Sequence, residues 1–171
     1  MSVGFPPVAR ADARVLILGS LPGAESLRLR QYYANAQNRF WWVMGEIVGA
    51  CAELPYEARL QRLVQGGIAL WDVCASAERA GSLDSSILAA SVVVNDFATF
   101  LHAHNDVKMI CFNGSGAERL FSRLALPLLT APKAKILRVR LPSTSPAHAG
   151  MPYHEKLRQW RSALGDLVGG A

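Results

Sequence analysis

The chain has 171 residues, of which 51% are hydrophobic, and this length and composition fit one domain, residues 1–171, with a substantial core. No apolar run reaches the roughly 20 residues of a membrane-spanning helix, and the opening segment lacks the apolar centre of a secretory signal, so we expect a cytoplasmic protein. The net charge is +5, and 14 of the 18 basic residues are arginine, which permits nucleic-acid binding without establishing it.

Short apolar runs alternate with amphipathic segments along the chain. The runs predict buried strands, and an apolar period near 3.6 residues predicts helices. In chain order, the elements expected are a strand at 14–19, helices at 39–50 and 56–65, a strand at 67–73, a helix at 95–104 capped by Asn95, a strand at 107–112, a helix at 117–126, a strand at 135–141 and a helix at 153–168. This order predicts an α/β protein, a three-layer α/β/α sandwich around a central, mostly parallel four-stranded sheet.

Four loops rich in small polar residues follow the predicted strands. They are GSLPG (19–23), DVCASAERAGS (72–82), NGSG (113–116) and LPSTSPAHA (141–149). Because open α/β sheets bind ligands beyond the carboxyl ends of their strands, we expect the functional site there.

Taken one at a time, these loops leave alternatives open. GSLPG lacks the Lys and Ser/Thr of a phosphate loop and suits a plain turn. Asp72 ends an apolar strand, so its carboxylate either serves a site or caps the next turn. Asn113 has an amide able to read a base edge, although capping the next helix is the simpler interpretation. The three hydroxyls of LPSTSP suit phosphate oxygens or an ordinary surface turn.

The three cysteines, Cys51, Cys74 and Cys111, form no CxxC pattern, and the histidines show no metal spacing. The cysteines are therefore interpreted as small buried hydrophobic residues rather than disulfides or zinc ligands.

The combination of motifs is more specific than its parts. GSLPG, YYANAQNRFWW, FNG and LPSTSP follow one another in an α/β frame of this length. Together they resemble the uracil-DNA glycosylase superfamily, in which the mismatch-specific branch carries F-x-x-P-x-N-R-F-W, G-I-N-P-G and N-P-S-x-L-S. The nearest resemblance is to the hypoxanthine-DNA glycosylase branch, with its G-S-x-P-G and P-S-T-S-P, and it extends from about residue 13 to residue 162.

This resemblance implies a monofunctional glycosylase that flips a deaminated base, hypoxanthine or uracil, out of DNA and lets water attack the sugar. Ser20 stands where most branches carry a carboxylate or amide that positions the water, and the resemblance moves that work to Asn38. The alternative for Asn38 is a cap on the helix that begins at Arg39. Leu141 stands where other branches carry a histidine or asparagine.

The resemblance also assigns the base-binding residues. It places the ring of Tyr33 against the flipped base and the Asp72 carboxylate at its Watson–Crick edge. The loop N–H groups around Gly19 and Leu21, with the Asn113 amide, stabilise the departing base.

The remaining assignments concern the DNA backbone and the partners. Residues expected to contact phosphates are Ser143, Thr144, Ser145, His148 and Arg39. We expect no cofactor and no metal, DNA with a deaminated base as partner, and a monomer. The alternative function is a non-catalytic DNA-binding module for damaged bases, which the inert residues at positions 20 and 141 would suit.

Overall fold

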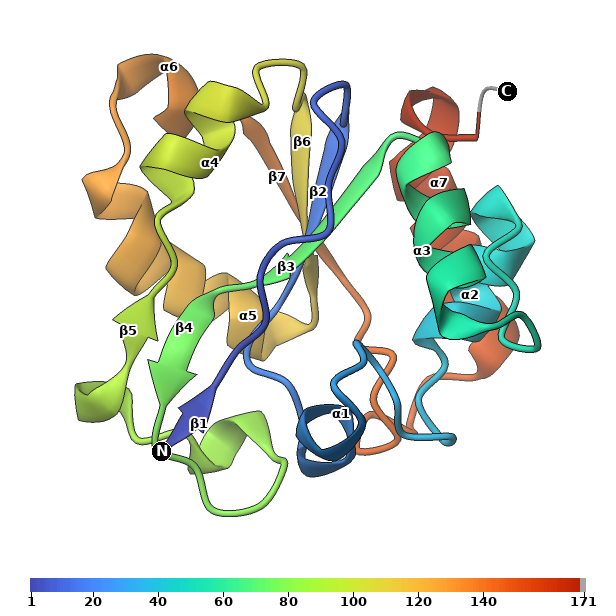
Figure 1. The fold of residues 1–171 in the computed structure, drawn as a ribbon, viewed down its shortest axis with the longest axis horizontal. Helices are drawn as coiled ribbons and strands as arrows, with labels where there is room; N and C mark the ends of the chain where they lie inside the picture. The colour runs from blue at the N-terminus through green and yellow to red at the C-terminus, as the bar shows by residue number, and fades with distance from the viewer. Residues whose placement is uncertain (170–171) are drawn as a thin grey trace.

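A parallel sheet with the strand order β3–β2–β6–β7 runs through the centre of the molecule (Figure 1). Its strands are β2 (Val15–Gly19), β3 (Ile68–Asp72), β6 (Met109–Asn113) and β7 (Leu137–Leu141). The computed structural model describes residues 1–169, so the last two residues of the expected 1–171 domain lie outside the described part. Three of the strands fall within the ranges predicted from their apolar runs, and β6 extends one residue beyond its predicted range, to Asn113. The parallel four-stranded sheet confirms the predicted fold class.

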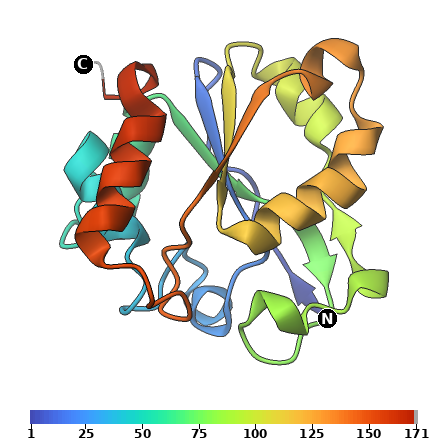
Figure 2. The same ribbon diagram turned by 180° about the vertical axis from the view of Figure 1, so that it is seen from behind.

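Helices cover both faces of this sheet, as the views from opposite sides show (Figures 1 and 2). They are α1 (Ala24–Leu29), α2 (Phe40–Val48), α3 (Tyr56–Gln65), α4 (Phe97–Ala103), α5 (Ser115–Leu120), α6 (Ala131–Ala134) and α7 (Tyr153–Leu164). Alternate strand residues point to opposite faces. Val15 and Ile17 therefore join the core under α2, α3 and α7, whereas Leu16 and Leu18 join the core under α4 and α5.

Several elements differ from the sequence predictions. A small antiparallel sheet of β1 (Ser2–Val3), β4 (Cys74–Ala77) and β5 (Val93–Val94) was not predicted. Helix α4 is capped by Asp96, whose carboxylate accepts from the Thr99 N–H at 3.0 Å, and not by Asn95. The Asn95 amide instead donates to the Asp72 carbonyl at 2.8 Å, which ties the end of β3 to the start of α4.

The strand register brings the polar strand ends together. Gly19 pairs with Asp72 across β2 and β3, and Asn113 pairs with Leu141 across β6 and β7. These residues form the carboxyl edge of the sheet, where the four predicted loops begin. No helix within residues 1–169 has both the length and the apolar character needed to cross a membrane.

Candidate active site

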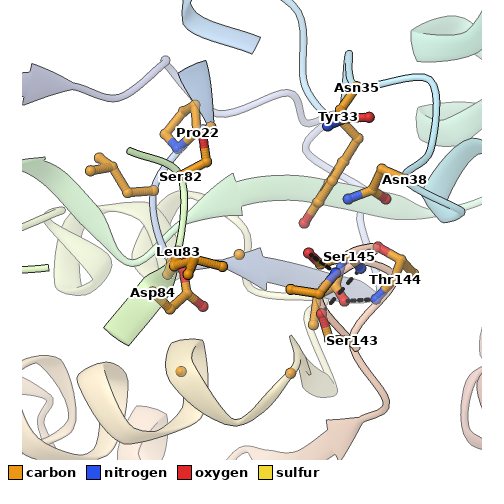
Figure 3. A pocket seen from close by; sticks show the side chains of 18 of the residues that line it. Pro22, Tyr33, Asn35, Asn38, Ser82, Leu83, Asp84, Ser143, Thr144 and Ser145 are labelled. Carbon is orange, nitrogen blue, oxygen red and sulfur yellow. Dashed lines mark hydrogen bonds between the residues drawn. The ribbon is translucent and has the colours of Figure 1, made fainter. Parts of the chain in front are cut away.

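A cavity of about 380 Å³ lies at the carboxyl edge of the sheet (Figure 3). Its volume falls in the range of small-molecule sites. Its walls come from residues 19–26, the 32–38 segment, Asp72, the 82–84 segment, the start of α5 and the 143–148 loop. The structure thus brings all four predicted loops to one cavity.

Asp72 is a buried carboxylic acid in the wall of this cavity. Its side chain is 4% exposed, and its Oδ2 atom has no hydrogen-bond partner among residues 1–169. Burial, reinforced by the negative charge of Asp84 and opposed by Arg79, raises the pKa of Asp72 to about 7. Near neutral pH the carboxyl group therefore divides between its protonated and ionised forms.

Gly19 allows two polar side chains to approach the floor of the cavity. A Cβ atom on Gly19 would lie 2.5 Å from Oδ1 of Asp72 and 3.0 Å from the hydroxyl of Tyr33. That hydroxyl is buried and makes no hydrogen bond within the described chain, and burial together with the charge of Asp72 raises its pKa. Only glycine leaves room for both groups here.

Tyr33 adopts an unusual backbone conformation, with φ at +53°. Residues other than glycine enter this region at an energetic cost and remain there when their surroundings fix them. Three side chains fix the backbone on either side of Tyr33. On one side, the backbone of Tyr32 is held at both ends: its carbonyl accepts from the Trp41 indole at 2.9 Å, and its N–H donates to the Tyr56 hydroxyl at 3.0 Å. On the other side, the N–H of Ala34 donates to Ser26 Oγ at 3.1 Å.

The ring of Tyr33 forms a wall of the cavity, and Figure 3 shows it extending inward. One of its faces stacks on Phe40, with ring centroids 4.0 Å apart and an interplanar angle of 22°. Phe40 is fully buried and Trp41 is 3% exposed, so both side chains pack in the core. The aromatic segment therefore builds a rigid platform of which Tyr33 is the cavity-side layer.

Asn38 lies at the rim of the cavity, beside the start of α2. Its Oδ1 accepts from the Phe40 N–H at 2.9 Å, so part of the amide stabilises the helix start. Its nitrogen has no hydrogen-bond partner among residues 1–169, and Figure 3 places it on the cavity side. Asn38 can therefore cap α2 through its side-chain oxygen and face the cavity with its side-chain nitrogen.

The Asn113 amide is held by Thr144 instead of capping α5. Its Nδ2 donates to the Thr144 hydroxyl and its Oδ1 accepts from the Thr144 N–H, both at 2.9 Å (Figure 3). Thr144 has no exposed surface, and its hydroxyl supports the loop from inside. The reciprocal pair fastens the 143–148 loop to the end of β6.

The other residues expected at the phosphates lie around the cavity. Ser143 and Ser145 are partly exposed, and each hydroxyl accepts from a backbone N–H two residues later at 3.2 Å. His148 lines the rim, and its carbonyl accepts from Lys156 at 2.6 Å. Arg39 is exposed outside the cavity, with its guanidinium 5.8 Å from the centre of the Trp42 ring.

Comparisons with known proteins agree with this geometry. Residues 6–167 match the family model described as the uracil DNA glycosylase superfamily. The chain belongs to the uracil DNA glycosylase superfamily. It is thus a DNA N-glycosylase, an enzyme that breaks the bond between a base and its deoxyribose.

Individual relatives support this assignment. A protein named hypoxanthine DNA glycosylase from Methanosarcina acetivorans is 41% identical over 115 residues, which cover 67% of this chain and 72% of that protein. One of the same name from Methanosarcina barkeri is 38% identical over 112 residues, 65% of this chain and 70% of the relative. The solution NMR structure of a candidate uracil DNA glycosylase from M. acetivorans has a TM-score of 0.80 and 34% identity, covering 97% and 98% of the two chains.

The glycosylase cavity also contains a residue that the sequence did not point to. Asp84, on the 3-10 turn Asp84–Ser86, accepts a hydrogen bond from the hydroxyl of Ser20. Ser20 is 7% exposed, and the neighbouring Leu21 is buried with Cys74 and Ala77. No local motif marks Asp84, because 64 residues separate it from its partner.

Within residues 1–169, no three His, Cys, Asp or Glu side chains come close enough to share a metal ion. The three cysteines are free thiols, two of them buried.

Proposed function

We propose that this glycosylase excises hypoxanthine from DNA, with uracil as a second substrate, and leaves an intact strand with an abasic site. The observation that carries the proposal is Oδ2 of Asp72, a buried oxygen without a described partner in a cavity walled by an aromatic ring. Buried polar atoms are rarely left unpaired, and a flipped base would supply the missing partner. The two relatives named hypoxanthine DNA glycosylase favour hypoxanthine.

The chemistry of a carboxylate explains the choice of deaminated bases. An ionised Asp72 accepts a hydrogen bond from N1–H of hypoxanthine or from N3–H of uracil. The parent bases, adenine and cytosine, have a lone pair on the corresponding nitrogen, which the carboxylate repels. In the same complex, the free face of the Tyr33 ring stacks on the base, and Gly19, which has no side chain, leaves the base space.

The reaction needs a positioned water and support for a departing anionic base. We assign the water to the Asn38 amide, and support of the base to the Asn113 amide and the backbone N–H groups of residues 19–23. Ser143, Ser145 and His148 hold the phosphates beside the flipped nucleotide, and Arg39 extends this contact. Since no lysine lines the cavity within the described chain, the product strand stays uncut.

Labelled duplexes with a single hypoxanthine, uracil or adenine test this function. Each is incubated with protein and then heated in alkali, which cuts the strand at an abasic site. We expect cleavage at hypoxanthine first, then uracil, with none at adenine and none without alkali. Asn38→Ala should lower the single-turnover rate by roughly 10²-fold, the typical cost of losing the alignment of a reacting group.

The matched control is Gln37→Ala, an exposed residue of the same turn that does not line the cavity. Its rate should equal that of the wild type. Absence of alkali-dependent cleavage at both lesions would contradict the proposal, and so would equal rates at hypoxanthine and adenine.

We also propose that the enzyme acts in the cytoplasm as a monomer and that residues 1–171 form one domain. The basic charge suits a DNA partner. Light scattering at micromolar concentration, with a molar mass near 18.5 kDa as the expected result, tests the monomer.

A further inference from the structure

Besides Glu25, which is paired with Arg28, two carboxylates line the cavity, and the function proposed above uses only Asp72. The second, Asp84, comes from a different segment and lines the same space (Figure 3). It accepts a hydrogen bond from the hydroxyl of Ser20, which lies in the GSLPG loop. The pairing therefore brings a carboxylate to a loop, GSLPG, that contains none.

The segment that carries Asp84 is fastened to this loop by several bonds. The Arg79 guanidinium donates to the carbonyls of Leu21, at 3.1 Å, and of Pro22. Ser82 Oγ accepts from the Ala24 N–H at 3.0 Å. These contacts hold residues 79–84 against the strand end, so the position of the carboxylate does not depend on the Ser20 bond alone.

The carboxylate of Asp84 also packs closely against Gly116. A Cβ atom at this position would overlap Oδ2 of Asp84 and lie 3.0 Å from its Cγ. Asp84 thus packs directly against the backbone of α5, with no side chain between them. The carboxylate is bordered by Ser20 on one side and Gly116 on the other.

The direction of the hydrogen bond determines whether Ser20 presents its hydroxyl proton or its lone pairs to the cavity. A carboxylate only accepts, so the single hydroxyl proton of Ser20 points to Asp84. Ser20 then presents lone pairs to the cavity and can accept a proton from a water molecule. A serine by itself is a poor base, but this one is hydrogen-bonded to a carboxylate that can take its proton.

We propose that the Ser20–Asp84 pair is the proton acceptor for the hydrolytic water. This inference rests on the proposed glycosylase function. The glycosidic C1′–N bond breaks and its electron pair leaves with the base, while the water oxygen bonds to C1′. One water proton moves to Ser20 Oγ as the original Ser20 proton moves to Asp84. Asp84 later returns its proton to solvent, and the anionic base takes one from solvent, so the sum is hydrolysis.

The charges near the Ser20–Asp84 pair are consistent with its role as the proton acceptor. Burial raises the pKa of Asp72 to about 7, and the negative charge of the exposed Asp84 contributes to that rise. Its charge also stabilises the positive charge that develops on the sugar. The other charged groups near it are Arg79, whose guanidinium lies on the GSLPG side, and Arg119, which lines the cavity.

Single-turnover excision from a hypoxanthine duplex, with enzyme in excess, tests the pair. Asp84→Asn and Ser20→Ala should each lower the rate by about 10²-fold. The double variant should be no slower than either single variant, because the two residues act as one unit. Affinity for the same duplex should change less than threefold. Asp84→Glu should recover part of the rate.

Ser85→Ala is the matched control, since Ser85 is an exposed neighbour on the same turn that does not line the cavity. An active wild type with full activity in Asp84→Asn would overturn this inference and leave the glycosylase function standing. Full activity in Ser20→Ala with loss in Asp84→Asn would overturn the relay through serine. An inactive wild type would instead refute the proposed function itself.

Discussion

Replacing Asp72 with asparagine is expected to stabilise the protein above neutral pH. Asparagine has nearly the same shape but no charge to bury. In the wild type, burial and the charge of Asp84 raise the pKa of Asp72 from its ordinary 3.8 to about 7. The folded state therefore binds more protons than the unfolded state between these two pH values.

The sign of the effect follows from this proton count. Where the folded state holds the extra proton, the free energy of unfolding decreases as pH rises. At 1.36 kcal/mol per pKa unit, the shift from 3.8 to about 7 costs the wild type about 4 kcal/mol over the complete titration, of which about 3 kcal/mol is lost between pH 5 and pH 8. The loss is complete above the folded-state pKa.

Urea unfolding of both proteins at pH 5 and pH 8 measures this quantity. The other titrating groups contribute equally to the pH dependence of both proteins, so their contributions cancel in the difference between variant and wild type. The free energy of unfolding of Asp72→Asn, relative to that of the wild type, should be about 3 kcal/mol higher at pH 8 than at pH 5. For a chain of this size, that difference corresponds to roughly 6–12 °C in Tm. The same advantage at both pH values would refute the view that Asp72 carries a proton in the folded protein.

Two further predictions concern the groups around Asp72. Thr144→Val removes the acceptor of the buried Asn113 amide and should lower the free energy of unfolding by about 1–3 kcal/mol in urea denaturation, and a loss below 0.5 kcal/mol would contradict this. Gly19→Ala inserts a methyl group 2.5 Å from Asp72 Oδ1 and 3.0 Å from the Tyr33 hydroxyl. It should lower single-turnover excision at least about tenfold while the far-ultraviolet circular dichroism stays unchanged, and full activity would show that these side chains move aside.

The sheet could be predicted because its signals are local. Each predicted strand is a short apolar run, and all five residues of β2 are buried on both faces of the sheet. Helix α3 has the predicted bounds, because Pro55 precedes it and two glycines follow it. The strands of the antiparallel sheet that have only two residues carry no periodic pattern, so β1 and β5 were not predicted.

Only those parts of the site that lie within a single loop could be predicted from the sequence. The four loops and the polar ends of β3 and β6 were identified because they follow apolar runs directly. Partnerships between loops were not identified, since Asn113 and Thr144 are 31 residues apart and Ser20 and Asp84 are 64 residues apart. Capping the next helix was the simpler of the two interpretations of Asn113 from its position alone, but its amide instead pairs with Thr144.

Two carboxylates in one cavity are an unexpected arrangement for an enzyme that binds a polyanion. Each negative charge there opposes the approach of phosphates, and the net charge of +5 over the whole chain offsets this only at long range. The proton that Asp72 retains up to a pH of about 7 removes one of the two charges from the resting cavity. Asp84 keeps the other charge close to Ser20, where the reaction creates a positive charge and releases a proton.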